Sequence, residues 1–276
     1  MDFSVLMSVY YKDNPQWLKE AVDSVMNNTI KPNEILIGID GPIPKELEEK
    51  LKELSAKYKQ IQLVCFKENR GRGAILFDTL PMSKFPLVAI MDSDDICYSD
   101  RFEKQLALFE QEKDLDILGG FIEEFDEDTK EIVSVRKVPL TQKDIMKFVK
   151  FRSPFNHVTV MFKKESILNI GGYSSTMRFA QDYHLWIRAV ANKLTVKNIS
   201  EVLVKVRVDF KMFGRRGGYK YFKLNKILQE ELLKYKLISF PRYLYNLAIR
   251  FVAQVILPWQ IRRWLYLNVL RKQKNV

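Results

Sequence analysis

Three carboxylates in four residues follow an apolar run in the stretch "LVAIMDSDD". The apolar residues 87–91 are typical of a buried strand, and Asp92, Ser93, Asp94 and Asp95 come directly after them. Like charges this close repel, and removing them from water is costly unless a positive charge compensates. Two interpretations follow: a solvated turn, or a site for a hard divalent cation such as Mg²⁺ or Mn²⁺, which prefers oxygen ligands.

The elements around this cluster alternate between strand-like and helix-like patterns. Strands are predicted at 3–10, 34–40, 61–66 and 87–92, with helices at 14–28 and 43–58 between them. Repeated βα units predict an α/β fold with a mainly parallel sheet and helices on both faces. Ligands of such sheets bind beyond the carboxyl ends of the strands. Tyr10, Asp40 and the aspartate cluster are therefore expected along one rim.

A loop rich in glycine and arginine, "KENRGRGAI" at 67–75, follows the third predicted strand. Its glycines let the backbone approach a ligand closely, and Arg70 or Arg72 could meet a phosphate. A flexible turn is the alternative. Asp40 could accept a hydrogen bond from a base or a ribose, or could simply form the turn before Gly41.

The charge of the chain is concentrated at its end. The protein has 276 residues and a net charge of +11, and residues 205–276 contain 17 Lys and Arg against three acidic residues. The part from residue 217 onward is predicted to be helical, with the polar residues Asn246, Arg250 and Gln254 four apart in an apolar stretch. Its longest uncharged run is 11 residues, whereas a bilayer-spanning helix needs about 20. The segment could lie in a membrane interface with its cations on the headgroups, or pack on the body.

Composition and charge divide the chain into two regions, 1–210 and 211–276, the second being basic and helical. Cys65 and Cys97 lie far apart without a CxxC pair. This argues against a disulfide scaffold or a thiolate zinc site and favours a reducing compartment. The N-terminus lacks the basic start of a signal peptide and is interpreted as a strand. We therefore expect a cytoplasmic protein.

Several motifs together resemble a known family. They are "LMSVYYKDNPQWLKEAVDSVMNNTIKPNEILIGIDG", "ENRGRGAI", "AIMDSDDICYSDRFEKQ", "FNHVTVMFKKESILNIGGY" and "AQDYHLWIRA". In this order they resemble the inverting glycosyltransferases of family 2, which have the GT-A fold, over about residues 3–208. The segment "FGRRGGYKYFKLNK" is similar to bacterial members that build capsule, O-antigen or cell-wall polysaccharide.

The resemblance implies a donor site for a nucleotide-sugar, with a UDP-sugar as the expected donor. Its residues would be Ser8, Val9, Tyr10 and Asp40 at the uracil, Asn69, Arg70 and Gly71 beside the nucleotide, and Ser93 and Asp95 at the ribose and sugar. The resemblance also makes Asp92 and Asp94 the metal-bridging motif for Mn²⁺ or Mg²⁺, with Asp94 as the direct ligand.

The family's general base is the aspartate of a Glu-Asp pair at a helix start, which here reads Gln181-Asp182. Asp182 would take the proton of the acceptor hydroxyl while the cation neutralises the departing diphosphate, so an α-linked donor gives a β-linkage. Gln181 removes one charge, so acceptor contacts are expected to differ. The chain lacks the Gln-x-x-Arg-Trp motif and the spans of processive synthases, so one sugar per encounter is expected.

Four further residues are candidates for the acceptor pocket or its surroundings. His157 is expected near the active site, with a structural histidine as the alternative. His184 is expected to line the acceptor pocket or to lie on the surface. Arg215 and Arg216 could sit on a loop that closes on the diphosphate, or in a linker.

The basic end suggests an anionic partner. We expect a lipid-linked saccharide acceptor and peripheral attachment to the inner face of the cell membrane. A sugar nucleotidyltransferase is disfavoured because strand 1 ends "SVYYKDNP" without a Gly-rich loop. A nucleic-acid-binding protein would use the basic residues on phosphates, but no such motif is visible and no nucleic acid is expected. A non-catalytic scaffold of the same fold is the remaining alternative.

Overall fold

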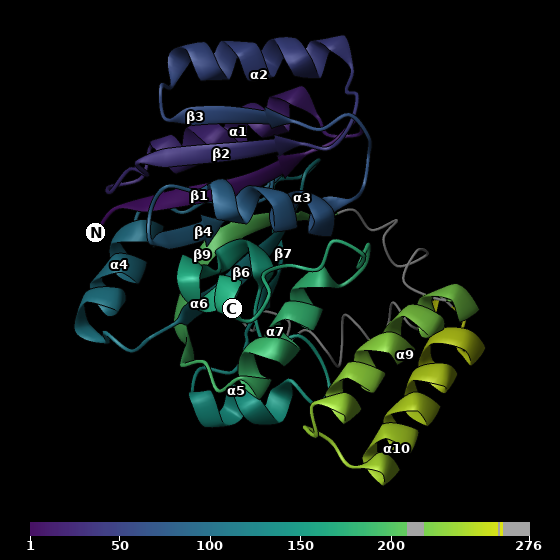
Figure 1. The fold of residues 1–276 in the computed structure, drawn as a ribbon. Coiled ribbons are helices and arrows are strands. Elements are labelled where there is room, and N and C mark those ends of the chain that lie inside the picture. The colour runs from purple at the N-terminus through teal and green to yellow at the C-terminus, as the bar shows by residue number, and fades with distance from the viewer. Residues whose placement is uncertain (209–217, 259, 262–276) are drawn as a thin grey trace.

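The computed structural model describes residues 1–208, 218–258 and 260–261 (Figure 1). Its strands are β1 Phe3–Val9, β2 Glu34–Ile39, β3 Ile61–Cys65, β4 Leu87–Ile90, β5 Ile96–Cys97, β6 Ile117–Asp126, β7 Ile132–Arg136, β8 Met161–Lys163 and β9 Val196–Val208. Its α-helices are α1 Pro15–Met26, α2 Lys45–Lys57, α3 Arg72–Thr79, α4 Arg101–Gln111, α5 Gln142–Phe148, α6 Lys164–Asn169, α7 Gln181–Ala191, α9 Tyr219–Lys234 and α10 Phe240–Phe251. Short helical turns lie at η1 Leu80–Met82, η2 His157–Thr159 and η3 Val252–Ile256. The strands and helices predicted for the first hundred residues are confirmed to within a few residues.

The strands form one sheet in the order β3-β2-β1-β4-β8-β6-β9-β5, with β7 beside β6. The first four are parallel neighbours, as repeated βα units require. β8 is antiparallel to both β4 and β6, whereas β6 and β9 pair in parallel. The carboxyl ends of β1, β2 and β4 therefore meet at one edge. The expected α/β architecture is confirmed, with a mixed second half of the sheet.

Helices cover both faces of the sheet, and the alternation of strand residues explains why. In β1, Val5 and Met7 face a core formed with α1, α2 and α4, whereas Leu6 faces a second core. β4 divides in the same way: Ala89 joins the first core and Val88 the second. The second core is closed by α3, α5, α6 and α7, with Trp186 fully buried within it. Strands buried on both faces need the continuous apolar runs seen in the sequence.

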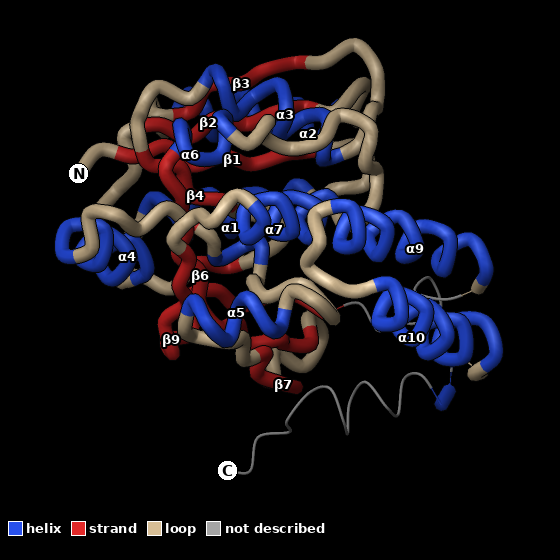
Figure 2. The backbone as a smooth tube through the Cα atoms, turned by 60° about the horizontal axis from the view of Figure 1, so that its bottom comes forward, coloured by secondary structure: helices blue, strands red, loops and turns tan. Residues whose placement is uncertain are grey.

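The helices α9 and α10 form an antiparallel pair at one side of the molecule (Figures 1 and 2). Leu228 and Leu232 of α9 and Tyr243 of α10 complete the second core beside α7. The helical character predicted for this region is thus confirmed for the described residues. Residue 210, the predicted boundary between the two regions, lies outside them.

The polar stripe of α10 faces the protein rather than solvent. Asn246 is buried and donates to the Gln229 side chain (2.8 Å) and to the Lys150 carbonyl (3.2 Å). Arg250 donates to the carbonyl of Phe151 and to Asn225. Many apolar side chains of the helix consequently point outward. Those exposed on α10 and just beyond it are Phe240, Leu244, Tyr245, Ile249, Phe251, Val252, Ile256 and Ile261.

Within the described residues, no helix has both the length and the apolar character needed to cross a bilayer.

Candidate active site

A cavity of about 350 Å³ opens at the edge where β1, β2 and β4 end. Of the eleven residues expected at the nucleotide-sugar and its metal, all except Arg70 and Asp95 line it. The lining residues are Ser8, Val9, Tyr10, Asp13, Asp40, Asn69, Gly71, Arg72, Asp92, Ser93 and Asp94. We call this space the donor cavity. The parallel register of the three strands brings together residues that are up to 86 positions apart in the sequence.

Asp40 fixes the loop that follows β3. Its carboxylate is buried and accepts the backbone N–H groups of Arg70 (2.7 Å) and Gly71 (2.9 Å). Gly41 has a φ of +80°, and a Cβ there would lie 2.6 Å from the Asn69 nitrogen, so only glycine fits. Asp40 thus shapes the wall of the donor cavity. Arg70 points its guanidinium at Asp78 on α3, which explains its absence from the lining.

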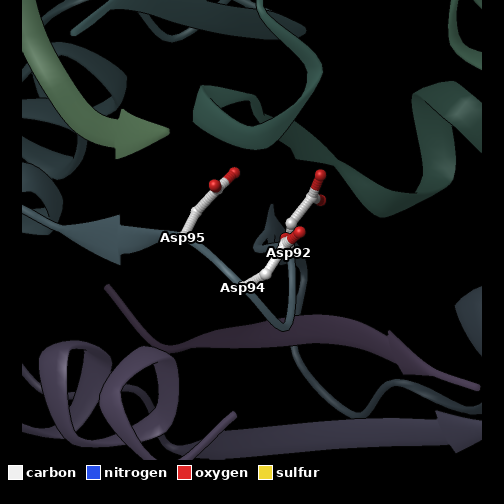
Figure 3. A group of neighbouring side chains, drawn as sticks. All are labelled: Asp92, Asp94 and Asp95. Atoms are coloured by element: carbon white, nitrogen blue, oxygen red, sulfur yellow. The ribbon is translucent and has the colours of Figure 1, made fainter. Parts of the chain in front are cut away.

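The aspartate cluster lies on the loop between β4 and β5 (Figure 3). One carboxylate oxygen from each of Asp92, Asp94 and Asp95 lies within 4.8 Å of the others. Burial and the neighbouring Asp92 charge raise the pKa of Asp94 to about 6, and burial raises the pKa of Asp95 well above its ordinary value. Arg207, at the end of β9, supports the loop by donating to the Asp94 carbonyl (2.6 Å) and the Asp95 carboxylate (3.1 Å).

A hydrogen-bonded chain leads from the cluster into the protein. Arg72 donates to both carboxylate oxygens of Asp92, one at 2.9 Å, and to Nδ1 of His157 at 3.0 Å. Because Arg72 only donates, Nδ1 accepts, and the proton of the neutral ring lies on Nε2, which donates to the Tyr173 hydroxyl (2.9 Å). Burial and the Arg72 charge hold the His157 pKa well below its usual range. His157 is therefore neutral and is connected to the aspartate cluster through Arg72.

Asp182 lies in the first turn of α7, two positions after a strained residue. Ala180 has a φ of +49°, a left-handed conformation that a non-glycine residue adopts only under constraint. Burial raises the Asp182 pKa, although the Tyr183 backbone N–H and the Arg72 charge oppose the rise. The Arg72 charge likewise opposes the rise in the pKa of Asp94. Both carboxylates therefore lie within electrostatic reach of the Arg72 guanidinium. A carboxylate with a raised pKa is better suited to accept a proton near neutral pH.

The sequence of this site matches a known family. Residues 4–178 match the family model described as Glycosyl transferase family 2. The chain belongs to glycosyltransferase family 2. It is therefore a glycosyltransferase, and the expected family and enzyme class are confirmed.

Curated relatives of this glycosyltransferase are similar over nearly its whole length. An uncharacterized glycosyltransferase of Haemophilus influenzae is 39% identical, over 99% of this chain and 100% of its own. The UDP-Gal:alpha-D-GlcNAc-diphosphoundecaprenol beta-1,3-galactosyltransferase of Escherichia coli is 36% identical, over 98% of this chain and 97% of its own. The amylovoran biosynthesis glycosyltransferase AmsE of Erwinia amylovora is 33% identical, over 96% and 97%.

Solved structures share the fold of this glycosyltransferase. S. aureus TarS (residues 1–349), in complex with UDP-GlcNAc, superposes with a TM-score of 0.69 at 15% identity, covering 98% of this chain and 76% of that one. The mannosyltransferase PcManGT from Pyrobaculum calidifontis, in complex with GDP-Man and Mn²⁺, gives a TM-score of 0.63 at 14% identity, covering 91% and 69%. At these identities the likeness concerns the fold, and it confirms the GT-A expectation.

The remaining predicted site residues lie apart from the donor cavity of this glycosyltransferase. Asp95 is the buried member of the aspartate cluster and accepts the backbone N–H of Arg207 on β9. Gln181 packs on Gly73 at the start of α3. His184 is on the side of α7 that meets α9, with Nε2 at 3.8 Å from Glu231. Arg215 and Arg216 are outside the described residues.

Two residues of the donor cavity make contacts that the sequence did not predict. Asp13 accepts the Ser93 hydroxyl (2.8 Å) and the Tyr10 backbone N–H (3.1 Å), and burial raises its pKa to about 6. Its place in "YYKDNP", directly after β1, could have indicated it. For Arg72 the sequence suggests only a phosphate contact. Nothing in the sequence indicates that its partner is Asp92.

Proposed function

We propose that this glycosyltransferase transfers one sugar from a UDP-sugar, with inversion of the anomeric centre, to a lipid-linked saccharide in surface polysaccharide synthesis. The observation that carries the proposal is the donor cavity. It combines the ends of β1 and β2 with a cluster of carboxylates at the end of β4. In an open α/β sheet this edge is where nucleotides bind. TarS with UDP-GlcNAc has the same fold, and the galactosyltransferase relative is named for a UDP-Gal donor.

The aspartate cluster is suited to Mn²⁺ or Mg²⁺. Its ligand atoms are carboxylate oxygens, which hard cations prefer, and they lie within 4.8 Å of one another. Burial, together with the charges of the neighbouring aspartates, raises the pKa values of Asp94 and Asp95, so a bound cation would stabilise their ionised forms. We assign Asp94 and Asp92 as the residues that hold the cation. When bound, such a cation neutralises charge on the departing diphosphate.

Asp182 is proposed as the general base. It lies within electrostatic reach of Arg72, whose guanidinium also contacts the donor cavity. An acceptor hydroxyl between Asp182 and the donor sugar would lose its proton to the carboxylate as it attacks. One displacement of this kind inverts the anomeric centre and needs no covalent intermediate.

The acceptor and the location of the enzyme are proposed together. The galactosyltransferase relative is named for an acceptor joined to undecaprenol through a diphosphate. The exposed apolar side chains of α10 and the basic character of residues 205–276 are suited to the surface of an anionic membrane. We propose peripheral attachment through α10 at the inner face of the membrane, where lipid-linked sugars are accessible.

A transfer assay tests this function. Purified protein is incubated with Mn²⁺, each of a panel of UDP-, GDP- and dTDP-sugars, and GlcNAc-α-diphosphate carried on an alkyl chain. The proposal predicts a disaccharide product whose new linkage is β by NMR when the donor is α-linked. An α-linked product, or transfer only from GDP- or dTDP-sugars, would contradict it.

A further inference from the structure

A second cavity, of about 360 Å³, is lined in part by Asp182. It is open to solvent and lies between α7, α9, α10 and the segment that follows α5. The residues that line it are Arg136, Arg152, Ser153, Phe179, Ala180, Asp182, Tyr183, Tyr221, Asn225, Leu228 and Arg250. We call it the arginine cavity. The arginine cavity lies beside the proposed base and shares no lining residue with the donor cavity. An acceptor that approaches Asp182 from this side would enter through it.

The arginines of this cavity come from three separate segments. Arg136 ends β7, Arg152 follows α5, and Arg250 is on α10. Among the described lining residues, the charged side chains are these three arginines and Asp182. Guanidinium groups bind phosphate oxygens in a bidentate manner.

Local contacts hold these arginines in position. Arg250 donates to the Phe151 carbonyl and to Asn225 Oδ1 (3.3 Å), and burial lowers its pKa. Arg136 donates to the Ser153 carbonyl (3.3 Å). Arg152 lies over the Phe148 ring, 5.7 Å from its centroid. Guanidinium groups fixed before a ligand arrives lose little conformational entropy when it binds.

We propose that the arginine cavity binds the diphosphate that joins the acceptor sugar to its lipid. This inference rests on the proposed function and specifies its acceptor subsite. The first acceptor sugar would then lie between the diphosphate and Asp182, which places its hydroxyl groups at the base. Arg250 shares α10 with the exposed Leu244, Tyr245 and Ile249. A lipid that leaves the cavity could then contact the outward-facing apolar side chains of the same helix.

A binding measurement in EDTA tests the cavity separately from catalysis. The probe is a short alkyl diphosphate without sugar or nucleotide, titrated by calorimetry. EDTA removes the metal through which a diphosphate could enter the donor cavity. Wild-type protein is expected to bind the probe, and Arg152→Gln and Arg250→Gln to weaken it at least tenfold. The control Lys234→Gln removes a charge from an exposed part of α9 and is expected to bind as wild type does. Binding that needs metal, or that UDP displaces, would overturn the proposal.

Kinetics provide a second readout that a folding defect would not reproduce. With a diphosphate-linked acceptor, Arg152→Gln should raise the KM for the acceptor about tenfold, which corresponds to about 1.4 kcal/mol. Its rate of UDP release without acceptor should equal that of wild type. With the same sugar as a neutral alkyl glycoside, wild type and Arg152→Gln should have equal KM values. An unchanged KM for the diphosphate acceptor would overturn the proposal, whereas absence of UDP release from wild type would contradict the proposed function instead.

Discussion

Arg72 and Asp92 form a bidentate ion pair in the lining of the donor cavity, and Arg72 also donates to His157. Asp92 is half of the proposed metal-binding pair, so its two oxygens already have a cationic partner. Asp94 has no such direct ion pair with any described residue, and its pKa is raised. A divalent cation would therefore bind first to Asp94 and share Asp92 with Arg72.

Replacing Arg72 should strengthen metal binding in the absence of nucleotide. Arg72→Gln removes a positive charge adjacent to the cluster and releases Asp92. We expect the Kd for Mn²⁺ to fall about tenfold, or about 1.4 kcal/mol, as measured by calorimetry. Arg70→Gln is the matched control, because Arg70 pairs with Asp78 on α3. Weaker Mn²⁺ binding by Arg72→Gln would show that Arg72 organises the cluster rather than competing with the metal.

Removing the proposed base should abolish transfer while leaving donor binding intact. Asp182→Asn keeps the size of the side chain but cannot accept the proton. Transfer should decrease by about 10²- to 10⁴-fold, with the Kd for UDP in Mn²⁺ unchanged. The exposed Asp114→Asn is the control. Turnover of Asp182→Asn within a few-fold of wild type would exclude Asp182 as the base.

The raised pKa of Asp13 predicts that the difference in unfolding free energy between wild type and Asp13→Asn depends on pH. Burial raises its folded pKa to about 6, above the unfolded value, so the folded protein holds the extra proton between about pH 4 and pH 6. Its contribution to stability is therefore present below pH 4 and is lost as the pH rises through 6. Asp13→Asn, in which an amide oxygen still accepts hydrogen bonds, should be more stable than wild type by about 1–2 kcal/mol at pH 7.

The difference between Asp13→Asn and wild type should disappear near pH 4, as measured by urea unfolding in EDTA. Comparing the two proteins cancels the contributions of His157 and His184, whose lowered pKa values act in the opposite direction. A stability difference that stays constant with pH would show that ionisation of Asp13 is not its cause.

The apolar face of α10 predicts membrane binding. Leu244 and Ile249 are about half exposed, and burying such side chains in a bilayer interface contributes roughly 1–2 kcal/mol each. Leu244→Ser with Ile249→Ser should weaken binding to phosphatidylglycerol vesicles at least tenfold in sedimentation assays. Phe77→Ser, an equally exposed position on α3, should have no effect. If the double variant bound the vesicles as wild type does, α10 would not be the contact.

The parallel half of the sheet could be predicted because its strands are buried on both faces and read as unbroken apolar runs. The same periodicity placed Tyr10, Asp40 and Asp92 at one edge. The partners of charged residues could not be predicted, since Arg72 and Asp92 are 20 positions apart and meet only through the packing of α3. The orientation of α10 could not be predicted from the sequence either. Asn246 and Arg250 face inward because α9 and the segment after α5 supply their hydrogen-bond partners.

The aspartate cluster is proposed to make sugar transfer from a UDP-sugar dependent on a divalent cation. The most direct test compares wild type with Asp94→Asn, each in Mn²⁺ and in EDTA. The quantity measured is the release of UDP from each of a panel of UDP-sugars. We expect release from one donor by wild type in Mn²⁺, with at least a hundredfold loss in EDTA and in Asp94→Asn. Release that persists in EDTA, or in Asp94→Asn at the wild-type rate, would contradict a metal-dependent role for the cluster.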